Sequence, residues 1–402
     1  MKKDSLSHKN FLLKDYYKNT QIKKAFDKIF NEINDRCDDT KNTYHVLSKK
    51  FNFDFKINYL KKYKKFKNIV IVGMGGSVLG SNAIYDFLKH KIKKKVTFFD
   101  NLDKEKLGRF KKNNNVSNCL FIIISKSGNT IETLSNLKGF NILKLNAKNI
   151  IIITEKRKNI LNTIAKKYNL FLIEHKNFLG GRYSVLSEVG IIPSFLMGIN
   201  IVKLRSNLKK YLKDKNKLFL KKSSLALSEI INKKKYRNLI FLNYSPKLEK
   251  FLFWCQQLIA ESLGKKGKGL LPTVSNAPKD HHSLLQLYLE GPKDKIFYIF
   301  SEKETTSNKL KAKKINKQEF FFDNKNIDQI KIAQKNAFIK ALLKNKIPFR
   351  EFKINSVDEQ TLGELFSYFI LETSIVGKLS KINPFDQPAV EQVKIFTKKL
   401  LS

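Results

Sequence analysis

Four hydroxyl side chains stand close together in residues 125–133 (SKSGNTIET), directly after the apolar run 119–124. Amide groups at the start of a helix, hydroxyls and a lysine ammonium together form a typical phosphate-binding turn. Asn129 and Glu132 have the spacing of a capping box, which predicts that a helix begins there. An ordinary polar turn is the alternative. The density of hydroxyls favours a phosphate loop, formed by Ser125, Lys126, Ser127, Thr130 and Thr133.

A glycine-rich loop, residues 73–80 (GMGGSVLG), follows a second apolar run at 68–72. Glycines let the backbone turn tightly and approach a ligand, and the next helix offers its first amides to an anion. A dinucleotide-binding fold is the rival, with Asp100 as the ribose-binding acid. However, Val78 occupies the place of the third glycine in a G-x-G-x-x-G fingerprint. The loop alone therefore leaves the choice open.

Two other segments each hold one charged residue that could act in catalysis. Arg182 follows a glycine pair in residues 180–187 (GGRYSVLS), where it could stabilise a developing anion, although a solvated surface turn is equally compatible. Glu261 lies near the end of an amphipathic helix over 254–265, which Gly264 is expected to terminate. From its position alone, Glu261 is expected to be an ordinary surface residue.

The histidine pair in residues 280–287 (DHHSLLQL) invites a metal-site hypothesis, which we reject. Neighbouring residues on a helix point about 100° apart, so His281 and His282 would not converge on one ion. No second cluster of His, Cys or Asp has ligand spacing either. The sequence therefore predicts no metal.

The segment 384–394 (PFDQPAVEQVK) is the last with a notable pattern. A helix that begins at Pro388 would place Glu391 and Lys394 on one face. The simplest explanation is a surface ion pair.

The elements that must position these residues are those of an α/β protein. Short β-branched runs without polar alternation, separated by helical stretches, are typical of parallel sheets covered on both faces. At 402 residues the chain is long enough for two such domains. Apolar residues at helical spacing before residue 60 predict a helical arm. The predicted strands are 68–72, 95–99, 119–124, 149–154, 237–242 and 294–300.

The net charge of +44 raises the possibility of a nucleic-acid partner. The excess is lysine, dispersed along the whole chain, whereas arginine is scarce; mostly solvated faces are therefore expected. Three distant cysteines, Cys37, Cys119 and Cys255, fit neither a disulfide framework nor a metal site. Because no secretory signal is visible and the apolar run 189–202 is too short to span a membrane, a cytoplasmic location is expected.

Taken together and in this order, the segments resemble the glucose-6-phosphate isomerase family of paired sugar-isomerase (SIS) domains. The resemblance covers residues 67–394 and rests on the motifs GMGGS, SKSGNTIET, GGRYS, AESLGK, DHHS and PFDQPAVEQVK. It implies two three-layer α/β/α domains, flavodoxin-like or Rossmann-like, with mainly parallel sheets and helical terminal segments. The implied division is a helical arm at 1–60, SIS domains at 61–195 and 196–380, and a helical tail at 381–402 that returns to the active site.

The resemblance also assigns roles to individual residues. Glu261 would move a proton between C2 and C1, Arg182 would face the cis-enediolate, and His282 with Lys394 would open the pyranose ring. The sugar phosphate would be held by Ser125, Lys126, Ser127, Thr130 and Thr133. The remaining pocket residues would be Gly76, Ser77, Gly181 and Gln387, with Glu132 near the reacting end.

The implied reaction is the reversible isomerisation of glucose 6-phosphate and fructose 6-phosphate, without a cofactor. The histidine would come from the neighbouring subunit of a homodimer, and neither a specific nucleic acid nor a membrane would be a partner. An isomerase of mannose or glucosamine phosphates and a non-catalytic SIS phosphosugar-binding protein are alternatives. The sequence departs from the family at His281 and Leu284, where glutamine is usual, and at Val393, where glycine is usual.

Overall fold

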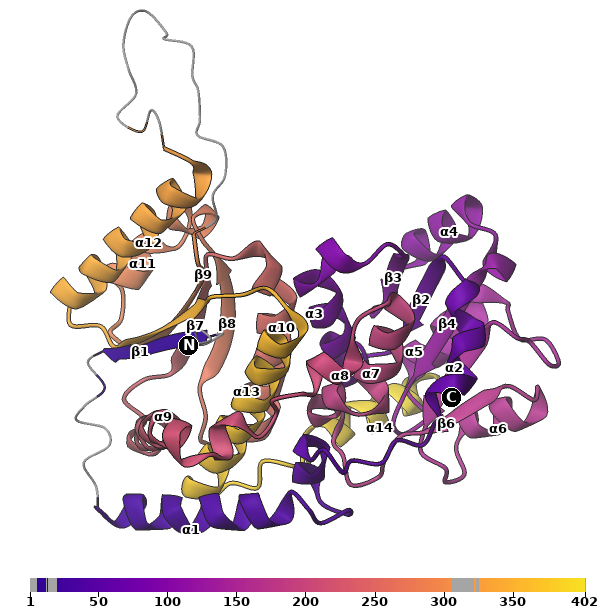
Figure 1. The fold of residues 1–402 in the computed structure, drawn as a ribbon, viewed down its shortest axis with the longest axis horizontal. Coiled ribbons are helices and arrows are strands. Elements are labelled where there is room, and N and C mark those ends of the chain that lie inside the picture. Colours follow the sequence, from indigo (N-terminus) through magenta and orange to yellow (C-terminus); the bar gives the residue numbers. More distant parts are fainter. Residues whose placement is uncertain (1–5, 12, 14–19, 305–321, 323–324, 402) are drawn as a thin grey trace, which may run out of the picture.

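A computed structural model describes residues 6–11, 13, 20–304, 322 and 325–401 (Figure 1). Two α/β bodies lie next to each other, and each contains one five-stranded sheet. The prediction of an α/β fold with mainly parallel sheets is confirmed. In the described part of the chain, no helix combines the length and the apolar character needed to cross a membrane.

The first sheet is entirely parallel, with the strand order β3-β2-β4-β5-β6. Its central strands are buried, and their apolar side chains fill the space beneath helices on both faces. This explains why these strands read as unbroken apolar runs. The strands are β2 (Asn68–Val72), β3 (Lys95–Phe99), β4 (Cys119–Ile124), β5 (Ile150–Thr154) and β6 (Phe171–Glu174); the helices are α3 (Leu79–Phe87), α4 (Lys104–Asn113), α5 (Ile131–Phe140) and α6 (Ile160–Lys167).

The second sheet has the order β1-β10-β9-β7-β8. All its neighbouring strands are parallel except for β1, which pairs antiparallel with β10 at the edge. The strands are β1 (Leu6–Phe11), β7 (Asn238–Asn243), β8 (Leu271–Asn276), β9 (Lys295–Glu302) and β10 (Phe349–Ile354). The helices around it are α9 (Asp214–Lys233), α10 (Glu249–Leu263), α11 (Leu285–Leu289), α12 (Ile327–Lys344) and α13 (Glu359–Leu379).

The N-terminal segment corrects one prediction. Residues 1–60 were expected to form a helical arm, and α1 (Thr20–Arg36) does bury Phe26, Phe30 and Ile33 at helical spacing. However, β1 is a strand of the second sheet, in register with β10 from Leu6 opposite Ile354. The middle of β1 is polar, which is typical of an edge strand, so the sequence contains no apolar run to recognise there.

Four further helices lie outside the two sheets' own strand–helix repeats. They are α2 (Ile57–Lys61), α7 (Glu188–Met197), α8 (Ile201–Leu204) and the C-terminal α14 (Val390–Leu401). Helix α10 packs against α3 of the first body and α13 of the second, so it lies where the two bodies meet. In contrast, α14 contains no buried residue. The end of α10 is therefore well placed to present a side chain to loops of the first sheet.

Candidate functional site

The glycine loop and the hydroxyl loop lie side by side because they leave neighbouring strands. β2 and β4 are adjacent and parallel, so the turns after Val72 and Ile124 emerge at the same edge of the sheet. The approach is close: a Cβ built on Gly73 would stand 2.7 Å from the carbonyl oxygen of Ile124. Gly75 has φ +51°, a conformation that favours glycine. The backbones of the two loops can therefore lie in direct contact at this point.

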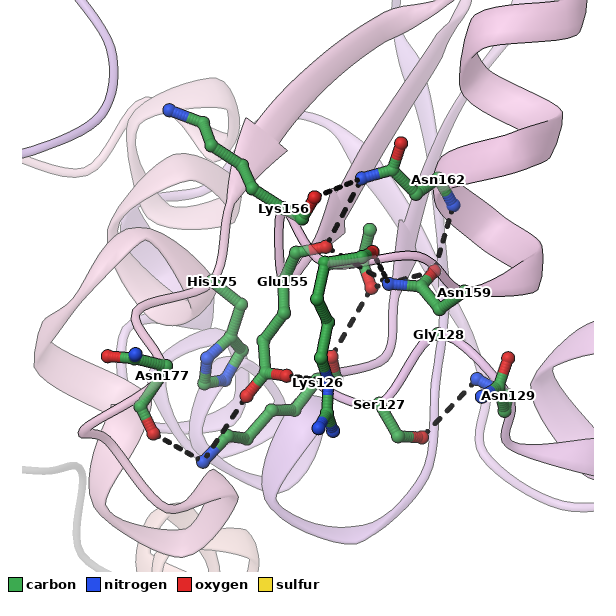
Figure 2. Close-up of polar contacts among 12 residues, drawn as sticks. Lys126, Ser127, Gly128, Asn129, Glu155, Lys156, Asn159, Asn162, His175 and Asn177 are labelled. Atoms are coloured by element: carbon green, nitrogen blue, oxygen red, sulfur yellow. Dashed lines mark hydrogen bonds and ion pairs between the residues drawn. The ribbon is translucent and has the colours of Figure 1, made fainter.

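Within the hydroxyl loop the side chains bond to one another and to the turn's own amides. Ser125 Oγ and Thr130 Oγ1 are 2.8 Å apart. The backbone amide of Asn129 donates to Ser127 Oγ over 3.3 Å (Figure 2). Thr133 Oγ1 is buried and has no hydrogen-bond partner among the described residues. The hydroxyls of Ser125, Ser127 and Thr130 thus form one compact group ahead of α5, and Thr133 lies in the first turn of that helix.

The start of α5 differs from the predicted capping box. The N-cap is Thr130, which makes no side-chain capping bond, and the helix begins at Ile131. The side-chain oxygen of Asn129 instead accepts from the backbone amide of Ile160, the first residue of α6. A tertiary contact has taken the side chain that local spacing assigned to the cap. Consequently, the first amides of α5 are not blocked by a capping side chain from this loop.

Lys126 extends from the hydroxyl loop toward the loops after β5 and β6 (Figure 2). Its ammonium donates to the backbone carbonyl of Asn177 over 2.8 Å and lies 3.7 Å from a carboxylate oxygen of Glu155. Burial lowers the pKa of Lys126, and the Glu155 carboxylate opposes that shift. The ammonium therefore links the hydroxyl loop to the segment that leads into the glycine–arginine motif.

Arg182 is buried, with 1% of its side chain exposed, and every part of its guanidinium is engaged. Nε donates to Ser262 Oγ over 2.8 Å, and Nη2 donates to the carbonyl of Pro384 over 2.7 Å. Nη1 donates to Glu261 Oε2 over 3.2 Å and to Gln387 Oε1 over 2.8 Å. These contacts overturn the alternative of a solvated surface turn. They join the glycine–arginine motif, the end of α10 and the C-terminal tail.

Glu261 lies near the end of α10, as predicted, but it is not an ordinary surface residue. Its side chain is 28% exposed, and its carboxylate lies between Arg182 on one oxygen and Gln257 Nε2, at 2.9 Å, on the other. Gln257 was not singled out from the sequence. Its spacing of four residues before Glu261 places both on one helix face and could have identified it. The two donors fix the carboxylate while leaving an accessible edge.

The glycine loop closes the same region from the other side. A Cβ on Gly76 would stand 2.2 Å from the carbonyl carbon of Gly181 and 2.5 Å from the amide nitrogen of Arg182. Only glycine fits there without moving backbone. The buried Ser77 follows directly. Thus Gly76, Ser77 and Gly181 come together with the arginine and the glutamate.

Two predicted catalytic residues lie apart from this cluster in the single chain. His282 is exposed in a short 3-10 turn, and within the described residues it makes no hydrogen bond to Arg182 or Glu261. Lys394 is exposed on α14 and bonds Glu391 Oε1 over 2.6 Å, the ion pair expected from the spacing. The neighbouring His281, in contrast, is held in place by a hydrogen bond: its Nε2 is 2.8 Å from the Tyr244 hydroxyl, and burial lowers its pKa.

The cluster combines a carboxylate, a guanidinium and a hydroxyl-rich anion loop. A carboxylate can remove a proton from carbon, and an adjacent buried cation can stabilise the resulting oxyanion. In the described part of the chain, no group of three or more His, Cys, Asp or Glu side chains is placed to bind a metal ion. The arrangement suits acid–base chemistry on a small phosphorylated molecule.

Comparison with known proteins gives a consistent result. The family model of phosphoglucose isomerase matches residues 35–402. A glucose-6-phosphate isomerase of Methanocaldococcus jannaschii is 32% identical, over 85% of this chain and 86% of the relative. One from Campylobacter jejuni is 30% identical, over 89% of this chain and 91% of the relative.

Solved structures show the same fold. A hypothetical protein of Thermus thermophilus superposes with a TM-score of 0.83 at 21% identity, over 98% of this chain and 100% of that one. A glucose-6-phosphate isomerase of Chlamydia trachomatis gives 0.69 at 19% identity, over 86% of this chain and 71% of that one. The chain belongs to the phosphoglucose isomerase family.

Proposed function

We propose that the protein interconverts glucose 6-phosphate and fructose 6-phosphate by moving a proton between C2 and C1. The observation that carries this function is the buried Arg182 guanidinium, 3.2 Å from the Glu261 carboxylate, in a segment that contacts the glycine loop after β2; the hydroxyl loop leaves the adjacent strand β4. Family membership supports the same substrate pair. Both the chemistry and the relatives favour an aldose–ketose isomerase.

In the proposed reaction Glu261 removes the proton from C2 of the open-chain aldose. The electron pair of the broken C–H bond forms the C1–C2 double bond, and the carbonyl oxygen becomes the enediolate oxygen. Arg182 stabilises that charge, since a buried guanidinium interacts more strongly than a solvated one. A proton then passes from the C2 hydroxyl to the oxyanion on C1, and Glu261 returns its proton to C1. The electron pair left on the C2 oxygen forms the carbonyl of the ketose.

The phosphate lies far from the reacting carbons and serves to orient the sugar. Ser125, Ser127 and Thr130 would hold it, together with Thr133, whose buried hydroxyl lacks a partner among the described residues. Lys126 would act at longer range, because its ammonium already bonds Asn177. Binding energy from a remote phosphate can be used to position the reacting end. Gln387 and Glu132 complete the proposed pocket.

Ring opening requires a separate acid–base pair, for which we propose His282 and Lys394. Both are exposed in the single chain, and α14 carries exposed apolar side chains at Val393, Phe396 and Leu400. Exposed apolar faces of this kind mark interaction surfaces. We therefore propose a homodimer, located in the cytoplasm, in which His282 of one subunit serves the site of the other.

Isomerisation is best tested by a coupled assay with fructose 6-phosphate on the wild type and on Glu261→Gln. We expect kcat to fall by roughly 10²–10⁴-fold, the usual contribution of a general base, while a non-reactive sugar-phosphate analogue still binds. Glu249→Gln, at the other end of α10, is the matched control and should keep its activity. Retention of activity in Glu261→Gln would eliminate this mechanism.

Substrate preference is tested in the same assay. Mannose 6-phosphate and glucosamine 6-phosphate should react more slowly than fructose 6-phosphate if the proposal is right. Faster turnover of either one would assign the protein to that substrate instead. Binding of phosphosugars without any turnover would identify a non-catalytic SIS protein.

A further inference from the structure

The second sheet repeats the strand order of the first. Read from β8, its order is β8-β7-β9-β10, which corresponds strand for strand to β3-β2-β4-β5. β7 is thus the counterpart of β2, which precedes the glycine loop, and β9 is the counterpart of β4, which precedes the hydroxyl loop. In sheets of this order, ligands bind beyond the carboxyl ends of the strands where the order reverses. In the second sheet that point lies between β7 and β9.

A cavity of about 200 Å³ occupies this position. Tyr244, Pro246 and Lys247 line it from the turn after β7, and residues 301–304 line it from the end of β9 and beyond. Helix α12 closes a further side with Lys331 and Lys335. The cavity is therefore built from the counterparts, in the second sheet, of the two turns that contribute to the candidate phosphosugar site in the first body.

Ser301 gives an independent indication of a ligand. This residue is 3% exposed, and its hydroxyl is buried without a hydrogen-bond partner among the described residues. An unpaired buried hydroxyl is costly unless a ligand or a water satisfies it. Ser301 lines the cavity from the position in β9 that directly precedes the last residue of the strand. A bound acceptor or donor there would complete its hydrogen bonding.

The charges around the cavity favour an anion. Four lysines and three carboxylates line it. Lys247 pairs with Glu302 at 2.8 Å, Lys331 with Asp328 at 3.2 Å, and Lys335 with Glu351, which lies outside the lining. In the described part of the chain, Lys303 has neither a hydrogen-bonded nor an ionic partner for its ammonium. In the part of the chain that the structure describes, no three His, Cys, Asp or Glu side chains lie close enough together to bind a metal ion, and this includes the carboxylates of the cavity. A metal cation is therefore a less suitable ligand than an anion.

We propose that this cavity is a second binding site for a small phosphate-bearing anion, separate from the candidate catalytic site. Ser301, Lys303 and Lys331 would contact the phosphate. Free phosphate and a phosphorylated metabolite share this chemistry, so the test includes both. The proposal does not depend on isomerase activity, because it rests on the residues of the second sheet and α12 alone.

The test is titration calorimetry of the full-length protein with inorganic phosphate and, separately, with fructose 6-phosphate. It should be run at physiological ionic strength, where diffuse attraction to surface lysines is largely screened. The variant is Lys303→Gln/Lys331→Gln. Lys344→Gln, an exposed lysine at the far end of α12, is the matched control. Melting temperatures verify that all three proteins are folded.

We expect the double variant to bind one equivalent fewer per chain than the wild type, with at least one of the two ligands, and to keep its isomerase activity. Loss of the equivalent with both ligands would identify a site for phosphate itself. Loss with fructose 6-phosphate alone would identify a site that also requires the sugar. Unchanged stoichiometry with both ligands would overturn the proposal. If the first site failed to bind, the difference between wild type and variant would still be measured.

Discussion

Arg182 illustrates how far a single residue can be interpreted before the fold is known. The glycine pair before it suggested close backbone approach, but solvent exposure was an equally good explanation. The structure shows that Arg182 is buried. Its guanidinium bonds Glu261 and Gln387, which lie about 80 and 200 positions away in the sequence. Such long-range partners leave no local pattern. The same applies to Asn129, whose predicted capping role was displaced by its bond to Ile160.

His175 allows a prediction about pH at the scale of one side chain. It is buried beside Lys126; Nδ1 is 3.1 Å from the Lys176 carbonyl, and Nε2 has no partner among the described residues. Burial lowers its pKa from 6.5 to about 4. Between these values the unfolded chain binds a proton that the folded chain does not. Its contribution therefore reduces stability as the pH falls through this window.

We expect the wild type to lose more stability than His175→Gln between pH 7 and pH 5, by about 2 kcal/mol. The measurement is urea unfolding at both pH values, compared as free energies of unfolding. His282→Gln changes an exposed histidine and should behave like the wild type. Equal losses in wild type and His175→Gln would show that His175 binds its proton equally well in the folded and the unfolded chain.

At the scale of elements, strands buried on both faces were the easiest to predict. β2, β3 and β4 were predicted at their observed bounds, and β5, β7 and β9 to within one or two residues. Four strands were missed. β1 and β6 lie at sheet edges, and β8 contains Pro272, whose ring is unusual within a sheet. In β10, charged residues interrupt the apolar ones, so the sequence contains no apolar run there. One of these charged residues, Arg350, is nevertheless buried, because it pairs with Glu372.

The contact between the glycine loop and the arginine segment leads to a second prediction. In Gly76→Ala the new methyl group would meet backbone atoms of Gly181 and Arg182 at 2.2–2.5 Å, so one loop must move. Displacements of about 1 Å can cost roughly a hundredfold in rate. We expect a loss of that order in kcat/KM, together with a lower melting temperature.

Gly108→Ala is the control for this loop. It lies inside α4, where an added Cβ meets nothing within 4 Å. Because alanine favours helix, this variant should gain about 0.5–1 kcal/mol of stability and keep full activity. If Gly76→Ala also kept full activity and stability, the contact between the two loops would not be as close as the structure shows, and the prediction would be wrong.

At the scale of the whole molecule, the lysine excess and the exposed C-terminal helix need different explanations. Many lysines pair with carboxylates on the surface, such as Lys221 with Asp27 and Lys378 with Glu32, but a net charge of +44 leaves most without a carboxylate. Those are expected to be solvated. The apolar face of α14 has no such explanation, because water does not favour it. A partner surface is therefore expected there.

A shared active site predicts complementation between inactive chains. Glu261→Gln and His282→Ala should each be inactive as homodimers, because every site lacks either the base or the ring-opening histidine. In a mixed dimer, one site would combine an intact Glu261 with the partner subunit's His282. Random co-assembly makes half of the dimers mixed, each with one working site of two. The expected activity is therefore about a quarter of the wild type.

Co-expression of Glu261→Gln with Arg182→Ala is the matched control for this experiment. Both changes affect the cluster that a single chain assembles by itself, since Arg182 and Glu261 are in direct contact. Neither site of a mixed dimer would then be complete, and no activity should return. Recovery in the first pair but not in the second would place the histidine across the interface. If the first pair stayed as inactive as its separate chains, His282 would have to act within its own subunit or not at all.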